Sequence, residues 1–590
     1  MYTIRQSEPY LLKPSDGFDA AFAVQSGTGG VVLIHMHASA KNGSAPLTLT
    51  FSWMHDNIDT AAAWSPCEYH NKQIRPDWGN FSESSATHGA PIFSNLSYDD
   101  QNRLTVACSD VKNRVGIRCG LLEESAELAC FVRIAVDQPV ESYEADIRID
   151  TRDIPFWEAI GDATRWMESY EGNTPSPIPE AALLPFYSTW YSFHHDLEPS
   201  RVLAECRYFK EAGCDALLVD GGWYKENNAR GLGWTGDWQS AKNKLGDMKA
   251  FVDQVHALGM KFVLWYAVGF VGIHSNAYEK WRDKQIDRLT LDACPLDPRY
   301  PEVRAHLIKT WTRAVSEWGL DGFKFDFIDS IPSSAEVKPG MDTVSVYDAI
   351  CRLMKDALTE LRQLKPDILI EFRQSYTGPL MRSFGNMLRS NDCPNDSYTN
   401  RLNTLSLRLF CGRTPVHSDM VMWSYHEPVE IAAFQLTNVL FSVPQISVLH
   451  SCMQDDHKKM VKHYLKFWKE HRRTLLEGEM FYHGYISNFN YVSSRLGDEQ
   501  IGAVYAGQIA VVKVPTDRVI LINASKDTTL LIKGLCGDYS LHITDCTGES
   551  VSCSTVHSAA PDEFIRIDAP VSAYIELQKI QSAMPTGRIC

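Results

Sequence analysis

The sequence predicts a (β/α)8 barrel, flanked by an N-terminal β-sandwich and a small C-terminal β-domain. The chain has 590 residues, several times the length of a typical single domain. Between residues 180 and 485, eight apolar strand-like runs alternate with amphipathic helical segments, which is typical of repeated βα units. Short β-rich runs lie on both sides of that region. We therefore expect three domains, over residues 1–172, 180–485 and 495–590.

The two flanking domains are predicted from strand-like runs that polar turns separate. The N-terminal runs lie at residues 31–40, 47–53, 103–110, 113–120 and 127–136. Their mixture of alternating and continuous apolar residues is typical of two packed antiparallel sheets. The proline-rich segment 172–185 marks the boundary with the barrel. Further runs at 509–515, 519–525 and 529–535 indicate the C-terminal β-domain.

The barrel is predicted from its strands and from the residues at their ends. The strands are expected at 186–193, 216–220, 261–267, 322–327, 367–372, 386–390, 414–419 and 445–449. Residues Val303, Leu307, Trp311, Ala314 and Trp318 recur at helical spacing, as in a helix that covers a barrel strand. Active sites of such barrels lie at the C-terminal strand ends. Those ends carry Trp190, Tyr191, Asp220, Trp265, Tyr266, Lys324, Asp326, Glu371, Arg373, Arg389, Asp392, His417, Asp419 and His450.

The fourth predicted strand carries the most specific motif. Lys324 and Asp326 are two positions apart, so their side chains should point to the same face of the strand. A nearby lysine keeps a carboxylate ionised at neutral pH, and an ionised, oriented carboxylate is what a glycosidase nucleophile must be. The alternative is a buried pair that only closes the barrel. Asp329 lies beyond the strand and is expected as a helix N-cap or a rim residue.

Composition excludes several classes of function. The 73 Asp and Glu residues exceed the 57 Lys and Arg residues, and a net charge of -16 disfavours nucleic acid and anionic membranes as partners. We find no secretory pattern, no transmembrane-length apolar run, no P-loop and no GxGxxG motif. The 15 cysteines form no CxxC pair, which favours a reducing compartment, and we expect a cytoplasmic protein that needs no cofactor.

A metal site is not expected. His417 and Asp419 lie two apart on a predicted strand, and His450 follows the last one, so these residues raise the question of zinc. No further ligands occur at a recognisable spacing, and HExxH is absent. We therefore interpret these side chains as hydrogen-bonded support for the site.

Five segments resemble the successive barrel motifs of glycoside hydrolase family 36, the α-galactosidases, and more loosely those of family 27. They are LLVDGGWY (217–224), GWTGDW (233–238), MKAFVDQVHALGMKFVLW (248–265), DGFKFDF (321–327) and LRSNDCPND (388–396). The resemblance covers roughly residues 180–480. It implies that Asp326 is the nucleophile, and that Lys324 and Asp220 bind sugar hydroxyls. The chain departs from the family at Gly221, where the family has a second aspartate.

The acid/base residue must come from another strand end. Asp392, three residues after Arg389, resembles the acid/base aspartate of the family, and Asp396 and Glu371 are the alternatives. Asp396 lies in a segment typical of turns, where an aspartate often bonds to its own backbone. Arg389 and Arg373 are expected either to bind sugar hydroxyls or to orient the acid; Arg389 could equally form a salt bridge within the barrel. Trp190, Trp238 and Trp265 are expected either to stack on a sugar face or to pack at the rim.

The expected function is that of a retaining α-glycosidase that hydrolyses terminal α-galactosyl groups by double displacement. The alternatives are an α-N-acetylgalactosaminidase or another α-pyranosidase, a transglycosylase that builds raffinose-type sugars, and a catalytically silent carbohydrate-binding protein. The partner is then a small-molecule or oligosaccharide substrate, and a homo-oligomer is compatible with the sequence. A loop of the N-terminal sandwich, such as residues 75–81, could reach the sugar site.

Overall fold

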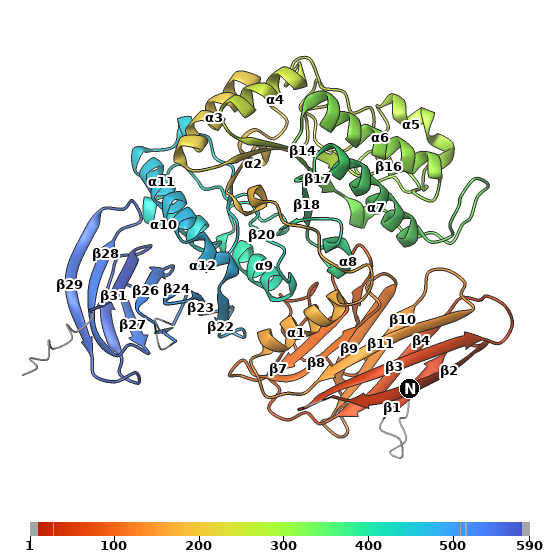
Figure 1. The fold of residues 1–590 in the computed structure, drawn as a ribbon, viewed down its shortest axis with the longest axis horizontal. Helices are drawn as coiled ribbons and strands as arrows, with labels where there is room; N and C mark the ends of the chain where they lie inside the picture. Colours follow the sequence, from red (N-terminus) through yellow and green to blue (C-terminus); the bar gives the residue numbers. More distant parts are fainter. Residues whose placement is uncertain (1–9, 28, 508, 514–515, 581–590) are drawn as a thin grey trace, which may run out of the picture. The chain divides into compact units, whose positions relative to one another are not determined.

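The computed structural model describes residues 10–27, 29–507, 509–513 and 516–580 (Figure 1). The chain divides into two compact units. The first comprises residues 1–392, 402–420 and 445–447, and the second comprises residues 393–401, 421–444 and 448–590. The outermost residues of the predicted flanking domains, 1–9 and 581–590, and residues 514–515 of a predicted strand, lie outside the described residues.

The N-terminal part of the first unit is a sandwich of two antiparallel sheets, as predicted. One sheet has the order β1 (Tyr10–Pro14), β4 (Thr48–His55), β10 (Leu128–Ala135), β9 (Arg114–Leu121), β6 (Ser82–Ser84). The other has the order β2 (Phe18–Ser26), β3 (Val31–Ala40), β11 (Ser142–Asp150), β8 (Asn102–Cys108), β7 (Ile92–Leu96), β5 (Ala62–Trp64). Alternating apolar residues of both sheets, such as Ile34, Phe51 and Val132, form one buried core. Helix α1 (Phe156–Glu168) follows, with its apolar side buried.

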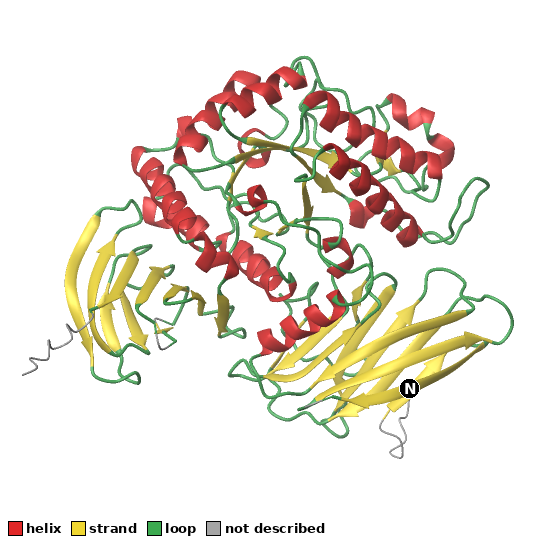
Figure 2. Cartoon of the chain, viewed as in Figure 1, coloured by secondary structure: helices red, strands yellow, loops and turns green. Residues whose placement is uncertain are grey.

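The rest of the first unit is built around a parallel, nearly closed barrel (Figure 2). Its strands are β12 (Phe186–Ser188), β13 (Ala216–Val219), β14 (Lys261–Ala267), β17 (Gly322–Asp326), β18 (Leu369–Arg373), β19 (Met387–Arg389), β20 (Val416–His417) and β21 (Gln445–Ile446). From β12 to β20 they pair in chain order, β12 also pairs with β21, and the sheet is open between β20 and β21. Each of the eight predicted strands overlaps one of these, so the predicted fold class is confirmed.

The first predicted strand, residues 186–193, is shorter in the structure. The strand ends at Ser188, and Trp190–Phe193 form the short helix α2. The hydroxyl of Ser447 accepts hydrogen bonds from the backbone N–H groups of Tyr191 and Ser192, both at 3.0 Å. These N–H groups are therefore satisfied without a neighbouring strand, and the chain can turn at the rim of the barrel.

Helices cover the outside of the barrel strands. They are α3 (Pro199–Ala212), α4 (Met248–Ala257), α6 (Pro301–Trp318), α7 (Val346–Leu364) and α9 (Ser397–Phe410). The predicted helix is α6, in which Val303, Leu307, Trp311 and Ala314 are buried. The Trp311 ring lies 4.5 Å from that of Phe325, whose side chain points outward from β17. This packing leaves the opposite face of β17, with Lys324 and Asp326, to the barrel interior.

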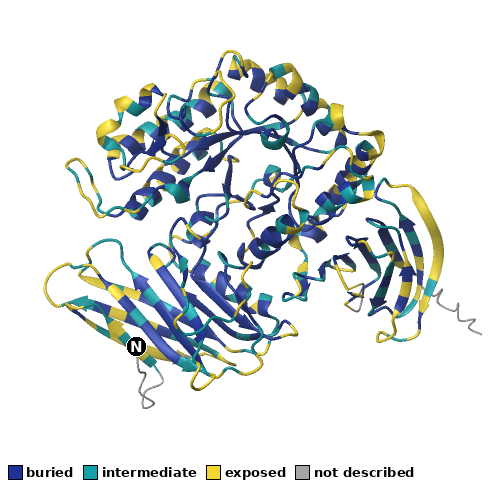
Figure 3. Ribbon diagram, turned by 180° about the vertical axis from the view of Figure 1, so that it is seen from behind, coloured by how far each residue is buried: buried dark blue, intermediate teal, exposed yellow. Residues whose placement is uncertain are grey.

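Shorter elements lie in the connections of the barrel. They are the helices α5 (Asn276–Lys280) and α8 (Pro379–Arg382), the hairpin of β15 (Phe270–Gly272) and β16 (Ala293–Pro295), and the 3-10 turns at Glu180–Leu183, Arg282–Lys284 and Ile328–Ser330. Figure 3 shows that the barrel strands are buried while the outer faces of the helices are exposed.

The described part of the second unit contains, besides the first residues of α9, three helices and two C-terminal sheets. The helices are α10 (Val429–Thr437), α11 (Asp455–Glu470) and α12 (Arg472–Glu477), with a 3-10 turn at His450–Cys452. One sheet orders β22 (Glu479–His483), β23 (Tyr491–Leu496), β24 (Glu499–Val504), β26 (Arg518–Asn523), β31 (Tyr574–Lys579), β28 (Gly537–Thr544) and β29 (Ser550–Ser558). The other orders β25 (Ile509–Val511), β27 (Thr529–Lys533) and β30 (Ile565–Asp568). Within the described residues, no helix is long and apolar enough to cross a membrane.

Candidate active site

A pocket with a volume of about 320 Å³ opens at the C-terminal ends of the barrel strands. Its walls come from residues that end or follow β12, β13, β14, β17, β18 and β19. Seven of the predicted site residues line it: Trp190, Asp220, Trp265, Lys324, Asp326, Arg373 and Asp392. The eighth, Arg389, is 1% exposed and lies behind Asp392. The strand-end reasoning therefore located residues that the structure brings together.

Asp326 is buried at the end of β17 and is held from several directions. Arg373 Nε donates to its Oδ1 at 2.6 Å, and the backbone N–H of Phe327 donates to the same oxygen at 2.8 Å. The Tyr376 hydroxyl lies 3.1 Å from Oδ1. The other oxygen, Oδ2, accepts one hydrogen bond, from Trp265 Nε1 at 2.9 Å. These contacts fix the orientation of the carboxylate.

The same contacts keep Asp326 ionised. Burial raises the pKa of its carboxyl group, but Arg373, Lys324 and the hydrogen bond from Trp265 lower the pKa by more, so that it lies below its ordinary value. The sequence predicted an ionised carboxylate because of Lys324. In the structure Arg373, which comes from the neighbouring strand β18, has the larger influence.

Replacing Arg373 with glutamine should therefore raise the pKa of Asp326. Since Asp326 must be ionised to react, the activity of Arg373→Gln should fall on acidification at a pH where the wild type is still active. The acid limb of a kcat/KM profile measures this ionisation in the free enzyme. Arg373→Lys keeps the positive charge and should hold the limb nearer to its wild-type position. If the acid limbs of the kcat/KM profiles of folded Arg373→Gln and Arg373→Lys lay at the same pH, this electrostatic role would be contradicted.

Lys324 forms its direct ion pair with Asp220, not with Asp326. Its Nζ donates to Asp220 Oδ2 at 2.6 Å, and both side chains are 4% exposed. The two residues come from β17 and from the end of β13, which are separated by β14. Side chains from alternate strands meet in one layer inside such barrels, which explains the pairing. Both residues still line the pocket, where a sugar hydroxyl could reach them.

The buried Arg389 side chain forms ion pairs with two aspartates, one of which is Asp392. Its Nη2 donates to Asp392 Oδ1 at 2.8 Å, and its Nη1 donates to Asp419 Oδ1 at 2.5 Å. The Tyr191 hydroxyl donates to the other oxygen of Asp419 at 2.8 Å. Of the three predicted roles of Arg389, these contacts favour orientation of Asp392 and a salt bridge within the barrel over direct sugar binding.

The pKa of Asp392 does not have the raised value that a general acid needs in order to be protonated. Burial raises its pKa, but Arg389 and Lys324 lower it by more, so that it lies below its ordinary value in the substrate-free site. The side chain is 52% exposed at the mouth of the pocket. The negative charge of Asp326 also raises the pKa of Asp392, but its effect is smaller than that of the two cations.

The two alternative acids have other surroundings. Asp396 Oδ1 accepts a hydrogen bond from the backbone N–H of Thr399 at 2.9 Å, in the first turn of α9, which is the turn chemistry expected for it. Glu371 is fully buried, accepts a hydrogen bond from Gln445 Nε2, and has a pKa that burial raises. Its Oε1 lies 3.7 Å from Arg389 Nε.

The tryptophans divide into two groups. Trp190 and Trp265 line the pocket, and Trp265 in addition donates to Asp326. Trp238 is 3% exposed and stacks on Trp223 at 5.8 Å, so its role is packing.

Two of the residues that raised the question of zinc, His417 and Asp419, contact other protein groups. His417 Nε2 lies 2.9 Å from the carbonyl oxygen of Ala182, and Asp419 is bound by Arg389 and Tyr191. Among the described residues, no group of three or more His, Cys, Asp or Glu side chains could hold a metal ion.

Several pocket residues were not predicted from the sequence. They are His194, His195, Gly221, Tyr224, Arg230, Gly231, Leu232, Leu291, Phe327 and Asn391. Most follow β12 or lie in the long connection after β13, where no periodic pattern marks a residue as facing the pocket. The motif Asp220-Gly-Gly-Trp223 was the available signal, because two glycines after a strand end predict close approach of the backbone.

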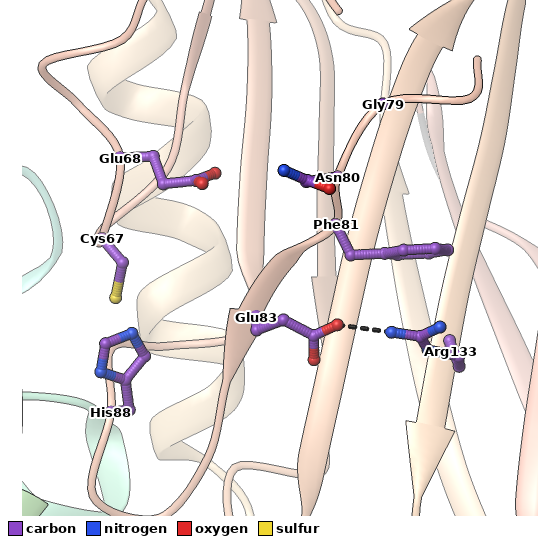
Figure 4. A pocket seen from close by; sticks show the side chains of 8 residues that line it. All are labelled: Cys67, Glu68, Gly79, Asn80, Phe81, Glu83, His88 and Arg133. Carbon is purple, nitrogen blue, oxygen red and sulfur yellow. Dashed lines mark hydrogen bonds and ion pairs between the residues drawn. The ribbon is translucent and has the colours of Figure 1, made fainter. Parts of the chain in front are cut away.

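A second hollow lies in the N-terminal sandwich (Figure 4). The loop 75–81, which was expected to reach the sugar site, lines this hollow with Gly79, Asn80 and Phe81. The hollow adjoins the barrel, since His88 Nδ1 lies 2.8 Å from Ser375 Oγ in the loop after β18. Nearby, Gln374 bonds to the Tyr69 hydroxyl at 3.2 Å and to the backbone N–H of Asn391 at 2.9 Å. The sandwich thus braces the loop that carries Asp392.

Comparisons with known proteins identify relatives of the barrel. Residues 183–379 match the Melibiase family model. The α-galactosidase Mel36A of Lactobacillus acidophilus is 24% identical over 194 residues, which cover 31% of this chain and 26% of Mel36A. An A type blood α-D-galactosamine galactosaminidase of Flavonifractor plautii is 24% identical over 180 residues, covering 27% of this chain and 16% of that protein. The matched stretches thus span about a quarter or less of these relatives.

A solved structure extends the likeness to nearly the whole chain. The GH36 α-galactosidase AgaA of Geobacillus stearothermophilus, in complex with raffinose, matches with a TM-score of 0.64 and 15% identity, covering 95% of this chain and 81% of AgaA. The fold and the pocket define the class first: a (β/α)8 barrel with carboxylates at the C-terminal ends of its strands. Within that class, the chain is similar to the GH36 α-galactosidases, in its fold and in the barrel segment that matches the Melibiase model, and the resemblance of its motifs to family 36 is confirmed.

Proposed function

We propose that this protein is a retaining α-glycosidase that hydrolyses terminal α-galactosyl groups. The observation that carries the proposal is Asp326, a buried, oriented carboxylate held ionised at the floor of a pocket that also presents Asp392. Two carboxyl groups around one sugar are the requirement of glycoside hydrolysis. The activities of Mel36A and of AgaA, as their names give them, support α-galactosyl groups as the substrate class.

The hydrogen bonds of Asp326 indicate which of its oxygens attacks the anomeric carbon. Oδ1 lies within hydrogen-bond distance of Arg373, Phe327 N–H and the Tyr376 hydroxyl, whereas among the described residues Oδ2 accepts a hydrogen bond only from the Trp265 N–H. An oxygen with a free lone pair is the better nucleophile. Attack by Oδ2 would form the glycosyl-enzyme, and release of the leaving oxygen would consume one proton.

In this mechanism Asp392 supplies that proton. Its low pKa in the substrate-free site is an obstacle, because a general acid must be protonated. A bound sugar would cover the half-exposed carboxyl group and remove water from it, which raises the pKa of a carboxyl group. After the leaving group departs, the ionised Asp392 activates water for the second displacement, and two inversions give net retention.

The direct test is turnover of 4-nitrophenyl α-D-galactopyranoside, followed by proton NMR of the sugar released. We expect the α-anomer of galactose to appear first and the β-anomer to accumulate only by mutarotation, because two inversions at one carbon restore its configuration. First appearance of the β-anomer would show inversion and contradict the double displacement.

Other specificities are tested in the same screen. Gly221 and the likeness to the Flavonifractor plautii galactosaminidase favour assaying α-N-acetylgalactosaminides and α-galactosaminides as well. A transglycosylase would transfer the galactosyl group to an added sugar acceptor. Absence of turnover on every glycoside would favour a silent carbohydrate-binding protein.

We further propose a cytoplasmic location and the domain boundaries predicted above. Cys119 and Cys130 lie directly opposite each other on β9 and β10 and are thiols in the structure. Such a pair supports a reducing compartment, because oxidising compartments favour disulfide formation. A homo-oligomer stays a prediction.

A further inference from the structure

One wall of the pocket has space where a side chain is missing. Gly221 follows Asp220 and lines the pocket. A Cβ atom at Gly221 would lie 3.7 Å from the Trp265 ring and 3.8 Å from His195 Nε2, which is ordinary van der Waals contact. A Cβ atom would therefore fit here, and the glycine leaves its volume free for a substituent of the bound sugar.

The same wall carries positive charge. Arg230 is exposed and lines the pocket, and no hydrogen bond or ion pair with another described residue engages its guanidinium group. Behind it, Lys225 Nζ donates to the carbonyl oxygen of Ala229, and Lys244 Nζ donates to that of His195 at 2.7 Å. Burial and the neighbouring Lys244 lower the pKa of Lys225 to about 8, and Asp196 offsets part of the charge of Lys244, so the unpaired positive charge on this wall is that of Arg230.

The acids on this side are already engaged. Asp220 is bound by Lys324 at 2.6 Å and by the backbone N–H of Gly221 at 2.8 Å. Asp196 lies 3.3 Å from Arg201. Neither of these two carboxylates forms an ion pair with Arg230.

The backbone beside Arg230 is held in place. The carbonyl oxygen of Ala229 accepts hydrogen bonds from Lys225 and from His195 Nδ1, the latter at 2.9 Å. Because Nδ1 donates, His195 Nε2 carries the lone pair, and burial lowers the pKa of this histidine to about 4, so it is neutral. His195 Nε2 can thus accept a hydrogen bond from a sugar hydroxyl.

We propose that the glycosyl group accepted by this pocket carries an oxyanion on its exocyclic carbon, a uronic acid carboxylate or a sulfate ester, which Arg230 binds beside Gly221. This inference rests on the proposed glycosidase function. The planar fork of arginine binds two oxygens of a carboxylate or sulfate at once. The substrate class would then be acidic α-galactosides rather than neutral ones.

The test compares three 4-nitrophenyl glycosides: α-D-galactopyranoside, α-D-galactopyranosiduronic acid and α-D-galactopyranoside 6-sulfate. We expect kcat/KM of the wild type to be at least about tenfold higher for one anionic glycoside than for the neutral one. Arg230→Gln should lower kcat/KM for that anionic glycoside by about 100-fold and change the neutral one by less than about threefold. The two anionic substrates separate carboxylate from sulfate.

Arg282→Gln is the control, since Arg282 is 70% exposed, pairs only with Glu279 in the described residues and does not line the pocket. It should leave all three rates unchanged. A wild type that prefers the neutral glycoside, or an Arg230→Gln variant that loses activity equally on all three, would overturn the proposal.

A binding measurement separates this proposal from the glycosidase function. Trp190 and Trp265 line the pocket, so their fluorescence should report titration with D-galacturonate, galactose 6-sulfate and galactose. If no glycoside is turned over but an acidic sugar binds at least about tenfold more tightly than galactose, and Arg230→Gln abolishes that difference, only the glycosidase function fails. Equal affinity for the three sugars would refute the oxyanion site itself.

Discussion

Asp326→Asn should abolish glycoside hydrolysis while the barrel stays folded. The amide has nearly the shape of the carboxylate, and its oxygen can still accept hydrogen bonds from Arg373 and Trp265. It lacks the negative charge that must attack the anomeric carbon. We expect kcat to fall by about 10⁴-fold or more, measured with 4-nitrophenyl α-D-galactopyranoside or with the acidic glycoside that the pocket prefers.

Rescue by a small nucleophile would show that the loss of activity comes from the missing carboxylate of Asp326. Asp326→Ala leaves space at the reacting carbon, so azide should restore part of the turnover and give an azide-substituted sugar of inverted, β configuration. The matched control is Asp321→Asn, at the other end of the same strand, where His256, Lys261 and Lys365 hold another buried carboxylate. That variant should lose stability but keep its activity per folded molecule. Wild-type rates in folded Asp326→Asn would remove Asp326 from the role of nucleophile.

The sequence predicted the barrel well because two simple patterns coincide in it. Strands buried on both faces are continuous apolar runs, and the polar residue that ends each run must face the mouth of the barrel. Asp220, Asp326 and Arg373 are found at the pocket for that reason. The burial of α6 likewise follows from its helical periodicity.

Partners of the site residues could not be predicted in this way. Spacing in the sequence placed Lys324 beside Asp326, but the barrel brings Asp220 within 2.6 Å of Lys324 and Arg373 within 2.6 Å of Asp326. Both pairs join different strands, so they depend on barrel closure and not on local pattern. The lowered pKa of Asp392 has the same origin, since it depends on where the buried Arg389 lies.

The residues that bear on specificity were the hardest to predict. His195 and Arg230 lie in connections whose backbone is fixed by individual hydrogen bonds, such as that from His195 to Ala229 at 2.9 Å. No periodicity records such bonds. Only the substitution at Gly221 marked this wall of the pocket as unusual, and the structure adds that positive charge faces the open space.

Asp392→Ala should separate substrates by their leaving groups. Without a general acid, an alkyl alkoxide is a poor leaving group, and we expect its glycosides to react about 10³-fold more slowly than with the wild type. Nitrophenolate needs little protonation, so nitrophenyl glycosides should lose only about tenfold in the first step. The variant should also lose the alkaline limb of its pH–rate profile, because that limb reports deprotonation of the acid.

The wild-type profiles and a second variant decide whether Asp392 is that acid. The Arg389 contact lowers the pKa of Asp392 in the free enzyme, and a bound sugar should raise it. With an alkyl glycoside whose first step limits turnover, the alkaline limb of kcat should therefore lie at higher pH than that of kcat/KM. Asp396→Ala removes a helix cap, which should lower stability by about 1 kcal/mol and leave the leaving-group dependence unchanged. If Asp396→Ala instead discriminates between leaving groups and Asp392→Ala does not, Asp396 is the acid/base residue.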